Sequence, residues 1–181
     1  MEQYLKKYLF RNDAHTYAVL DGASVPNLPI RMHETEAVNA CLMTGELPDD
    51  LVYAAPYLVY LEPGDAFTEW VLAECWGKHW GIFAQSPVSF TGIRKKLRSL
   101  LIVNREDGNP KIFRFYDPRV ISPFLMTCAT DELELIFEDV SYFFAENTET
   151  NELLRFNLKK NKLVETKLRM QEEPETVGVR K

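Results

Sequence analysis

The feature that most constrains the fold is an alternation, in the middle of the chain, between short apolar runs and segments with helical spacing. Residues 57–61 (YLVYL) and 80–85 (WGIFAQ) have the length and composition of buried strands. In 66–76 and 90–100, apolar residues recur three to four positions apart, which places them on one face of a helix. A chain that alternates in this way builds a sheet and packs helices against it, so we predict an α/β or α+β domain.

Turn-forming residues and apolar periodicity extend this prediction along the chain. Further strands are predicted at 17–23, 37–43, 142–147 and at two sites within 100–116 joined by a turn at 107–110; short helices are predicted at 28–36, 47–56 and from Thr130. Asp65 and Ser89 are predicted helix N-caps, and Ser122-Pro123 a further helix start. The expected architecture is a mixed central sheet flanked by helices, with a C-terminal hairpin.

The same pattern gives an expected domain organisation. Residues 1–16 are predicted to be an N-terminal helix or tether, and 17–147 the α/β domain. Residues 148–170 are predicted to be a short C-terminal hairpin appendage, and the polar segment 171–181 a flexible tail. A chain of 181 residues is long enough to hold one domain with a core of its own.

Composition indicates a cytoplasmic protein without membrane insertion. The chain is 46% hydrophobic and 12% aromatic, yet its apolar runs are far shorter than a membrane span. The first ten residues lack the apolar stretch of a signal peptide. The three cysteines are odd in number and widely spaced, which favours free thiols over a disulfide framework.

The charges are segregated along the chain. Residues 120–154 contain eight acidic and no basic residues, whereas Arg94, Lys95, Lys96 and Arg98 form a basic cluster on a predicted helix. This segregation favours protein partners with complementary charge, because a nucleic-acid surface needs a wider basic field. We predict no nucleic-acid binding. The basic cluster itself remains either a solvated helix face or a docking site for an acidic partner.

Residues with catalytic or metal-binding potential do not form a recognisable site. His15, His33 and His79 share no metal-ligand spacing, and Gly77 interrupts the helical spacing between Cys75 and His79. Nucleophile motifs and glycine-rich phosphate loops are also missing from the sequence. We therefore predict no metal, no cofactor and no enzymatic activity. A less favoured alternative is a small enzyme that uses Asp21, Asp117 and Arg119 in a cleft at a strand edge.

An aromatic loop is the first candidate surface for a partner. Trp76 and Trp80 flank Gly77, Lys78 and His79, in a loop where large aromatic residues can serve as exposed anchors. Burial in the core is an equally good explanation of the two tryptophans. Trp76, His79 and Trp80 are retained as candidate partner-binding residues.

The second candidate is the segment FRFYDPRVISPFL (113–125), in which a strand-like run stops at Asp117-Pro118. Alternation places Arg114 and Tyr116 on the face of the strand opposite the two phenylalanines. Asp117 is expected to accept backbone N–H groups of the next turn while Pro118 fixes φ, so the two form a structural corner.

A cation beside this corner is unusual, because the start of a helix carries partial positive charge. Arg119 is therefore expected to bond back to an acid such as Asp117, or to be presented to a partner. Arg114, Tyr116 and Arg119 complete the set of candidate partner-binding residues.

Five segments together resemble a known family. YAVLDGA, LPDDLVYAAPYLVYLEP, FTEWVLAECWGKHWGIF, LRSLLIVN and FRFYDPRVISPFL occur in the order found in the effector-chaperone (adaptor) domain of bacterial type VI secretion systems. That family was long catalogued only as a domain of unknown function. The resemblance covers about residues 17–145 and implies a non-enzymatic adaptor. Such an adaptor binds a secreted toxic effector and helps mount it on the spike (tip) protein of the secretion apparatus.

The chain departs from the family pattern at its C-terminal end. Many relatives carry a long C-terminal lobe after this domain, whereas only about 35 residues follow here. We therefore expect that the short hairpin and the charges around it take over the cargo-gripping role of such a lobe, or that the cargo surface differs. An immunity-type inhibitor that blocks a toxin is the other reading consistent with protein binding.

Overall fold

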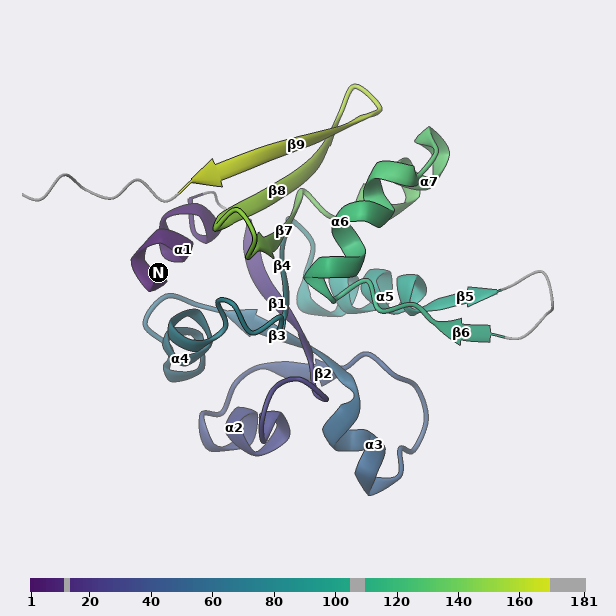
Figure 1. Ribbon diagram of the computed structural model, residues 1–181. Coiled ribbons are helices and arrows are strands. Elements are labelled where there is room, and N and C mark those ends of the chain that lie inside the picture. The colour runs from purple at the N-terminus through teal and green to yellow at the C-terminus, as the bar shows by residue number, and fades with distance from the viewer. Residues whose placement is uncertain (12–13, 105–109, 170–181) are drawn as a thin grey trace, which may run out of the picture.

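The computed structural model describes residues 1–11, 14–104 and 110–169, which fold as a sheet with helices on both faces (Figure 1). Within these residues the helices are α1 (Glu2–Leu9), α2 (Leu28–Glu34), α3 (Asp49–Ala54), α4 (Ala66–Glu74), α5 (Phe90–Leu101), α6 (Pro118–Thr127) and α7 (Thr130–Phe137). The strands are β1 (His15–Asp21), β2 (Asn39–Cys41), β3 (Pro56–Leu61), β4 (Gly81–Ser86), β5 (Ile102–Asn104), β6 (Pro110–Ile112), β7 (Tyr142–Asn147), β8 (Glu152–Lys159) and β9 (Lys162–Arg169). The predicted class, a sheet flanked by helices, is confirmed. The predicted tail (171–181) and the tip of the predicted turn (107–109) lie outside the described residues.

The central sheet has the strand order β2-β3-β1-β4-β7-β8-β9, and β5 pairs with β6 in a separate two-stranded sheet. Each strand pair among the described residues is antiparallel. The C-terminal hairpin continues the central sheet because β8 pairs with β7. Lys160 and Asn161 form its two-residue loop with φ of 50° and 59°, the left-handed conformation that favours a tight hairpin.

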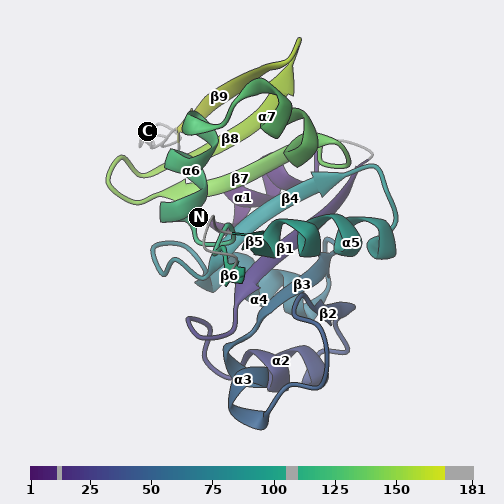
Figure 2. The ribbon, with the colours of Figure 1, turned by 90° about the vertical axis from the view of Figure 1, so that its right-hand side faces the viewer.

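Strand β1 is central and separates two hydrophobic cores. Its side chains alternate, so Tyr17 and Val19 enter one core and Ala18 and Leu20 the other. Helices α5, α6 and α7 cover the first core, on the side of the sheet that faces the viewer in Figure 2. Helices α1, α2 and α4 cover the second core on the opposite side.

A close backbone contact places the loop before β4 beside the end of β1. A Cβ atom on Gly81 would lie 2.1 Å from the carbonyl oxygen of Val19, so this approach requires glycine. The N–H of Asp21 donates to the carbonyl of Trp80 at 2.8 Å. Asp21 and the aromatic loop are therefore held together at one end of the sheet.

The strand predicted at 113–116 is wrong, since β6 ends at Ile112. The N–H of Asp117 donates to the carbonyl of Arg114 at 3.0 Å and closes a four-residue turn. Alternation does not apply within a turn, and Phe115 and Tyr116 are both buried in the same core. The prediction that Tyr116 lies on the face opposite Phe115 is wrong for this reason, and buried Tyr116 leaves the candidate partner surface.

The helix start predicted at Ser122-Pro123 is also wrong. Helix α6 begins at Pro118, and Ser122 and Pro123 lie inside it. The Ser122 hydroxyl donates to the carbonyl of Pro118 at 3.1 Å instead of capping a new helix. Asp117-Pro118 provides an N-cap and a proline at the first helical position, so Pro123 costs one internal hydrogen bond without starting the helix.

Candidate functional site

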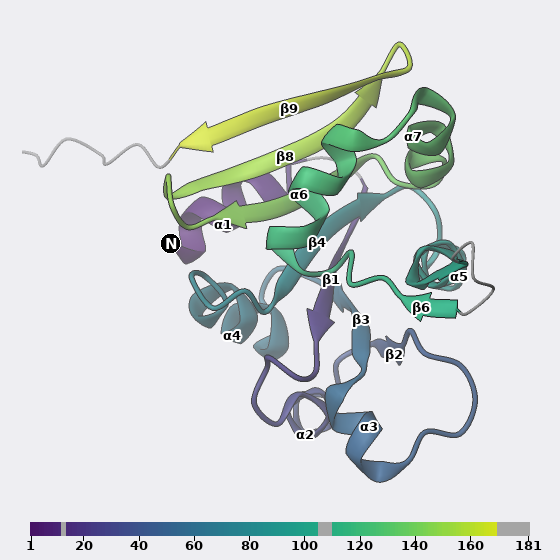
Figure 3. The ribbon, with the colours of Figure 1, turned by 45° about the vertical axis from the view of Figure 1, so that its right-hand side comes forward.

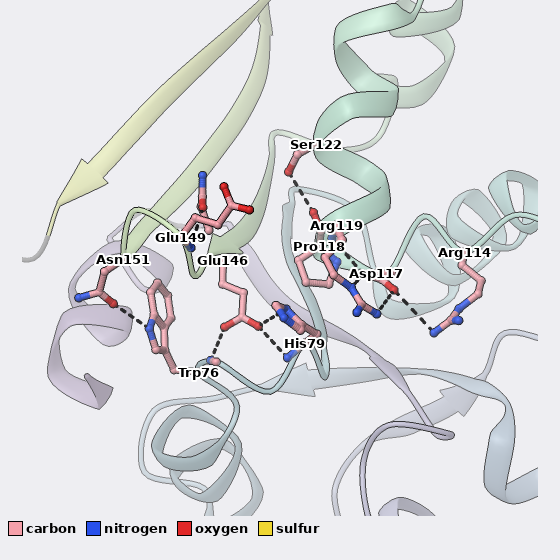
Figure 4. A network of polar contacts seen from close by, with 12 residues as sticks. Trp76, His79, Arg114, Asp117, Pro118, Arg119, Ser122, Glu146, Glu149 and Asn151 are labelled. Atoms are coloured by element: carbon pink, nitrogen blue, oxygen red, sulfur yellow. Dashed lines mark hydrogen bonds and ion pairs between the residues drawn. The ribbon is translucent and has the colours of Figure 1, made fainter.

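The candidate site begins at the corner between β6 and α6, which Asp117 organises (Figure 4). Asp117 is the N-cap of α6, and its Oδ1 accepts the backbone N–H of Arg119 at 2.9 Å. The same oxygen accepts Nε of Arg119 at 2.9 Å, and Oδ2 accepts the NH2 group of Arg119 at 2.7 Å. One carboxylate thus caps the helix and binds the guanidinium through two parallel bonds.

This pairing accounts for the cation at the helix start. The partial positive charge of the first turn disfavours Arg119, but two charge-assisted bonds to Asp117 offset that repulsion. The Arg119 side chain is nevertheless 61% exposed. It therefore presents a positive, fixed and accessible group at the surface.

Arg114 links the corner to the end of β1. Its NH2 group lies 2.6 Å from Oδ2 of Asp21 and 3.7 Å from Oδ2 of Asp117. Asp21 also accepts the N–H of Ala23 at 3.1 Å and the hydroxyl of Ser24 at 2.8 Å. The guanidinium lies between two buried carboxylates and ties the turn after β1 to the start of α6.

The protonation state of Asp117 follows from these contacts. Burial by itself raises the pKa of Asp117, but the hydrogen bonds from Arg119 and the charges of Arg119 and Arg114 outweigh burial and lower the pKa. Both oxygens of Asp117 and both of Asp21 already accept hydrogen bonds or ion pairs. This arrangement suits a structural clamp better than a general acid or base, which must exchange a proton.

A second polar network holds the aromatic loop against β7. The Glu146 carboxylate accepts the N–H of Gly77 at 2.5 Å and that of His79 at 2.7 Å, and Nδ1 of His79 lies 3.0 Å from the same carboxylate, without hydrogen-bond geometry. Gly77 and His79 have φ of 77° and 53°. Trp76 donates from Nε1 to Asn151 in the turn between β7 and β8, at 3.1 Å.

The two networks meet at a polar pocket of about 410 Å³. Arg119 and Pro118 line it from α6, His79 from the loop, and Glu146 and Glu149 from β7 and the turn after it. Figure 4 shows these side chains converging from three separate parts of the chain. The pocket wall carries an exposed cation beside carboxylates, which fits recognition of polar protein surface.

Comparison with known proteins gives one match. A family model described as "Domain of unknown function (DUF4123)" matches residues 16–135, more than half of the chain. The chain belongs to this family. No curated protein and no solved structure matches the chain.

The family region includes both networks except for Glu146 and Asn151, and the pocket residue Glu149 also follows residue 135. In the part of the chain that the structure describes, no helix is both long and apolar enough to cross a bilayer. Across the same residues, no three His, Cys, Asp or Glu side chains gather as a metal site would require. Cys75 is buried, and burial raises the pKa of its thiol to about 12.

The two tryptophans of the aromatic loop differ in exposure. Trp80 is buried beside Trp70 in the second core, which favours the core alternative and removes Trp80 from the candidate partner surface. Trp76 is half-buried and its ring packs edge-on against Tyr4. His79 is partly exposed at the pocket. Of the three candidate residues in this loop, Trp76 and His79 remain accessible to a partner.

The basic cluster is less solvated than the sequence predicts. Arg94 donates to the carbonyl of Cys41 at 3.3 Å, and its Nε is buried without a partner. Lys96 is only 9% exposed and pairs with Glu138, just after α7, at 3.1 Å. Arg98 is half-buried, so of the four cations Lys95 is the exposed one. Two of the four cations, Arg94 and Lys96, therefore attach α5 to its neighbours.

Sequence reasoning missed the contacts that span the chain. In the sequence, Glu146 is one acid of an acidic stretch, and no local pattern connects it with the aromatic loop. It binds Gly77 and His79, which lie 69 and 67 residues earlier. Arg114 and Asp21 are 93 residues apart. The apolar run that ends in Asp21-Gly22 correctly predicted a strand that ends at Asp21. Its pairing with Arg114 depends on the order of the strands in the sheet, which the run does not specify.

Proposed function

We propose that the protein is a cytoplasmic adaptor, without enzymatic activity, that binds a secreted toxic effector and helps load it onto the spike (tip) protein of a type VI secretion system. The observation that carries this proposal is the resemblance of five segments to the effector-chaperone domain. All five fall within residues 16–135, the region matched by the family model.

The geometry of the candidate site supports binding over catalysis. The carboxylates of Asp21 and Asp117 are engaged by arginines and by backbone or hydroxyl donors. Arg119 and Arg114 keep 61% and 49% of their side-chain surface exposed while fixed in position. The Arg114 guanidinium lies over the ring of buried Tyr116, and arginines that are fixed in position and exposed are common at protein interfaces.

The test is co-purification from cells that express the chain with the effector encoded beside its gene and with a spike protein. We expect a complex that retains both partners, and an unrelated secreted protein as control should not be retained. Pull-downs that retain neither the effector nor the spike protein contradict the proposal.

Toxin activity within the complex separates an adaptor from an immunity-type inhibitor. The toxin should keep its activity when bound to an adaptor, provided its active site is not covered. Stoichiometric loss of toxin activity, with protection of a susceptible cell, would instead assign the chain to the inhibitor class.

A further inference from the structure

An apolar groove of about 440 Å³ lies over the first core, between α5, α6 and α7. Figure 3 shows these helices and β6 gathered on one side of the sheet. We call it the α5–α7 groove; its principal lining residues are Leu100, Ile102, Phe113, Phe124, Leu135 and Ile136. It is separate from the polar pocket beside Arg119, whose lining residues differ.

Large apolar side chains at this groove are open to solvent. Leu135 of α7 is 65% exposed and Ile102 of β5 is 55% exposed, and both line the groove. Ile112 and Met126, on the adjoining β6 and α6, are 53% and 54% exposed. Ile112 is the cross-strand partner of Ile102, so exposed apolar surface continues from the groove onto β6, as is common at a site for another protein.

The two rims of the groove carry opposite charge. On α7, Glu132 lines the groove, and Asp131 beside it is exposed. On α5, Ser99 lines the groove, and Lys95 lies one turn earlier on the same helix face. At one end, the Lys96–Glu138 ion pair of 3.1 Å joins the two walls. An occupant with one basic and one acidic flank would match these rims.

We infer that the α5–α7 groove binds an amphipathic helix of the effector. Helices α5, α6 and α7 form most of its walls, and Ile102 of β5 and Phe113 complete them, so that apolar side chains form a surface that can receive the apolar face of another helix. The bound helix places apolar residues at i, i+3, i+4 and i+7 against Leu135 and Ile102, acidic residues toward Lys95, and basic residues toward Glu132. That the partner is the effector rests on the proposed function. The apolar spacing and the charged flanks of the bound helix are inferred from the groove itself.

The first test measures affinity between the purified chain and the effector. Leu135→Asp and Ile102→Asp place a charge in the apolar contact and should each weaken binding at least about tenfold. Leu51→Asp is the matched control, because Leu51 is a 41% exposed leucine on α3, which contributes nothing to the groove. It should leave affinity unchanged. Thermal unfolding of each variant verifies that it is folded.

The second test does not depend on the effector. A displayed library of 18-residue helix-forming peptides, randomised in sequence, is selected on the wild-type chain and counter-selected on Leu135→Asp. Enriched peptides should share the apolar spacing and carry basic residues on one flank and acidic residues on the other. Lys95→Glu should weaken them more at low salt than at high salt.

The outcomes separate the two proposals. If the effector binds wild type and both groove variants equally, the groove inference is wrong and the adaptor function stands. If the effector does not bind wild type, the adaptor function fails, and the peptide selection alone decides the groove. Peptides without the apolar spacing, or bound equally by Leu135→Asp, overturn the inference. So does a wild-type dimer that Leu135→Asp converts to monomer, because the occupant is then a second copy of this chain.

Discussion

Arg119 lies in the first turn of a helix, where the partial positive charge of the helix end disfavours a cation. The neighbouring carboxylate of Asp117 makes the cation favourable there. Asp117 lies between the helix end and the guanidinium, so the positive end of the helix and the positive side chain share one anion. Arg114 adds a second cation at 3.7 Å from the same oxygen. The corner is therefore more stable with Asp117 in its charged form.

The cost of removing this carboxylate can be measured against another aspartate in the same local position. Asp117→Ala should lower the free energy of unfolding by about 2–3 kcal/mol, because it removes a helix cap and charge-assisted bonds from Arg119. Asp65 is the N-cap residue of α4 but makes no side-chain capping bond. Asp65→Ala should therefore cost less than about 1 kcal/mol. Equal losses in denaturant unfolding of the two variants would contradict the assigned role of Asp117.

The lowered pKa of Asp117 makes a prediction about acid stability. Because the folded-state pKa lies below the unfolded value near 3.8, the unfolded chain binds the proton more tightly. The stability contributed by Asp117 is therefore present above pH 3.8 and is lost as pH falls through the folded-state pKa. The free-energy difference between wild type and Asp117→Asn should be constant from pH 7 to about 5 and shrink below pH 4. A difference that stays the same down to pH 3 would exclude this linkage.

The contacts of a residue can be predicted from sequence only when the residues that it contacts are close to it along the chain. Asp117, Pro118 and Arg119 are adjacent, so local turn chemistry was sufficient to predict the corner. For Arg119 it gave two alternatives, which were pairing with Asp117 and presentation to a partner. Arg114 and Asp21 are joined only because β1, β4 and the turn after β6 meet at one end of the sheet. No local pattern specifies that meeting.

At the scale of elements, α5 joins three parts of the fold. Ile93 and Leu97 enter the first core, Arg94 reaches the carbonyl of Cys41 in β2, and Lys96 reaches Glu138 after α7. The apolar spacing of α5 identified its buried face. Its charged face was expected to be solvated, because sequence gives no information about which neighbours lie beside a helix.

Charge reversal on α5 should therefore affect stability unequally. Arg94→Glu places a carboxylate against the carbonyl of Cys41 and should lower Tm by several degrees, since a loss of about 1–2 kcal/mol shifts a domain of this size by roughly 2–8 °C. Lys95 is one residue away and exposed, so Lys95→Glu should leave Tm within about 2 °C of wild type. Differential scanning calorimetry of the two variants makes the comparison. A similar Tm for both would show that the Arg94 contact contributes nothing to stability.

The elements that sequence placed correctly are those with an unambiguous period or cap. Ser89 was predicted as an N-cap, and its hydroxyl accepts the N–H of Gly92 at 3.4 Å. The errors lie at 113–123, where aromatic residues alternate with polar ones and two prolines compete for the same helix start. There the hydrogen-bonded turn from Arg114 to Asp117, and not strand propensity, determines the backbone conformation.

At the scale of the whole molecule, the hairpin of β8 and β9 completes both cores. Leu154 and Phe156 of β8 are buried in the first core, and Leu153 in the second. The family match ends at residue 135, before β7, whereas the sheet continues through three more strands. The part of the sheet beyond the family match therefore supports the same cores as the part within it.

Truncation tests whether the hairpin can be treated as an appendage. A chain ending at Asn147 loses Leu153, Leu154 and Phe156, and each buried side chain of this size contributes roughly 2–5 kcal/mol. Their sum is comparable to the ~5–15 kcal/mol that stabilises a whole domain, so this chain should not unfold cooperatively. A chain ending at Arg169 keeps each described strand and should retain the cooperative transition of the full-length protein. Circular dichroism melts with near-ultraviolet detection distinguish the cases. A cooperative transition in the chain ending at Asn147 would mean that residues 1–147 hold their core alone.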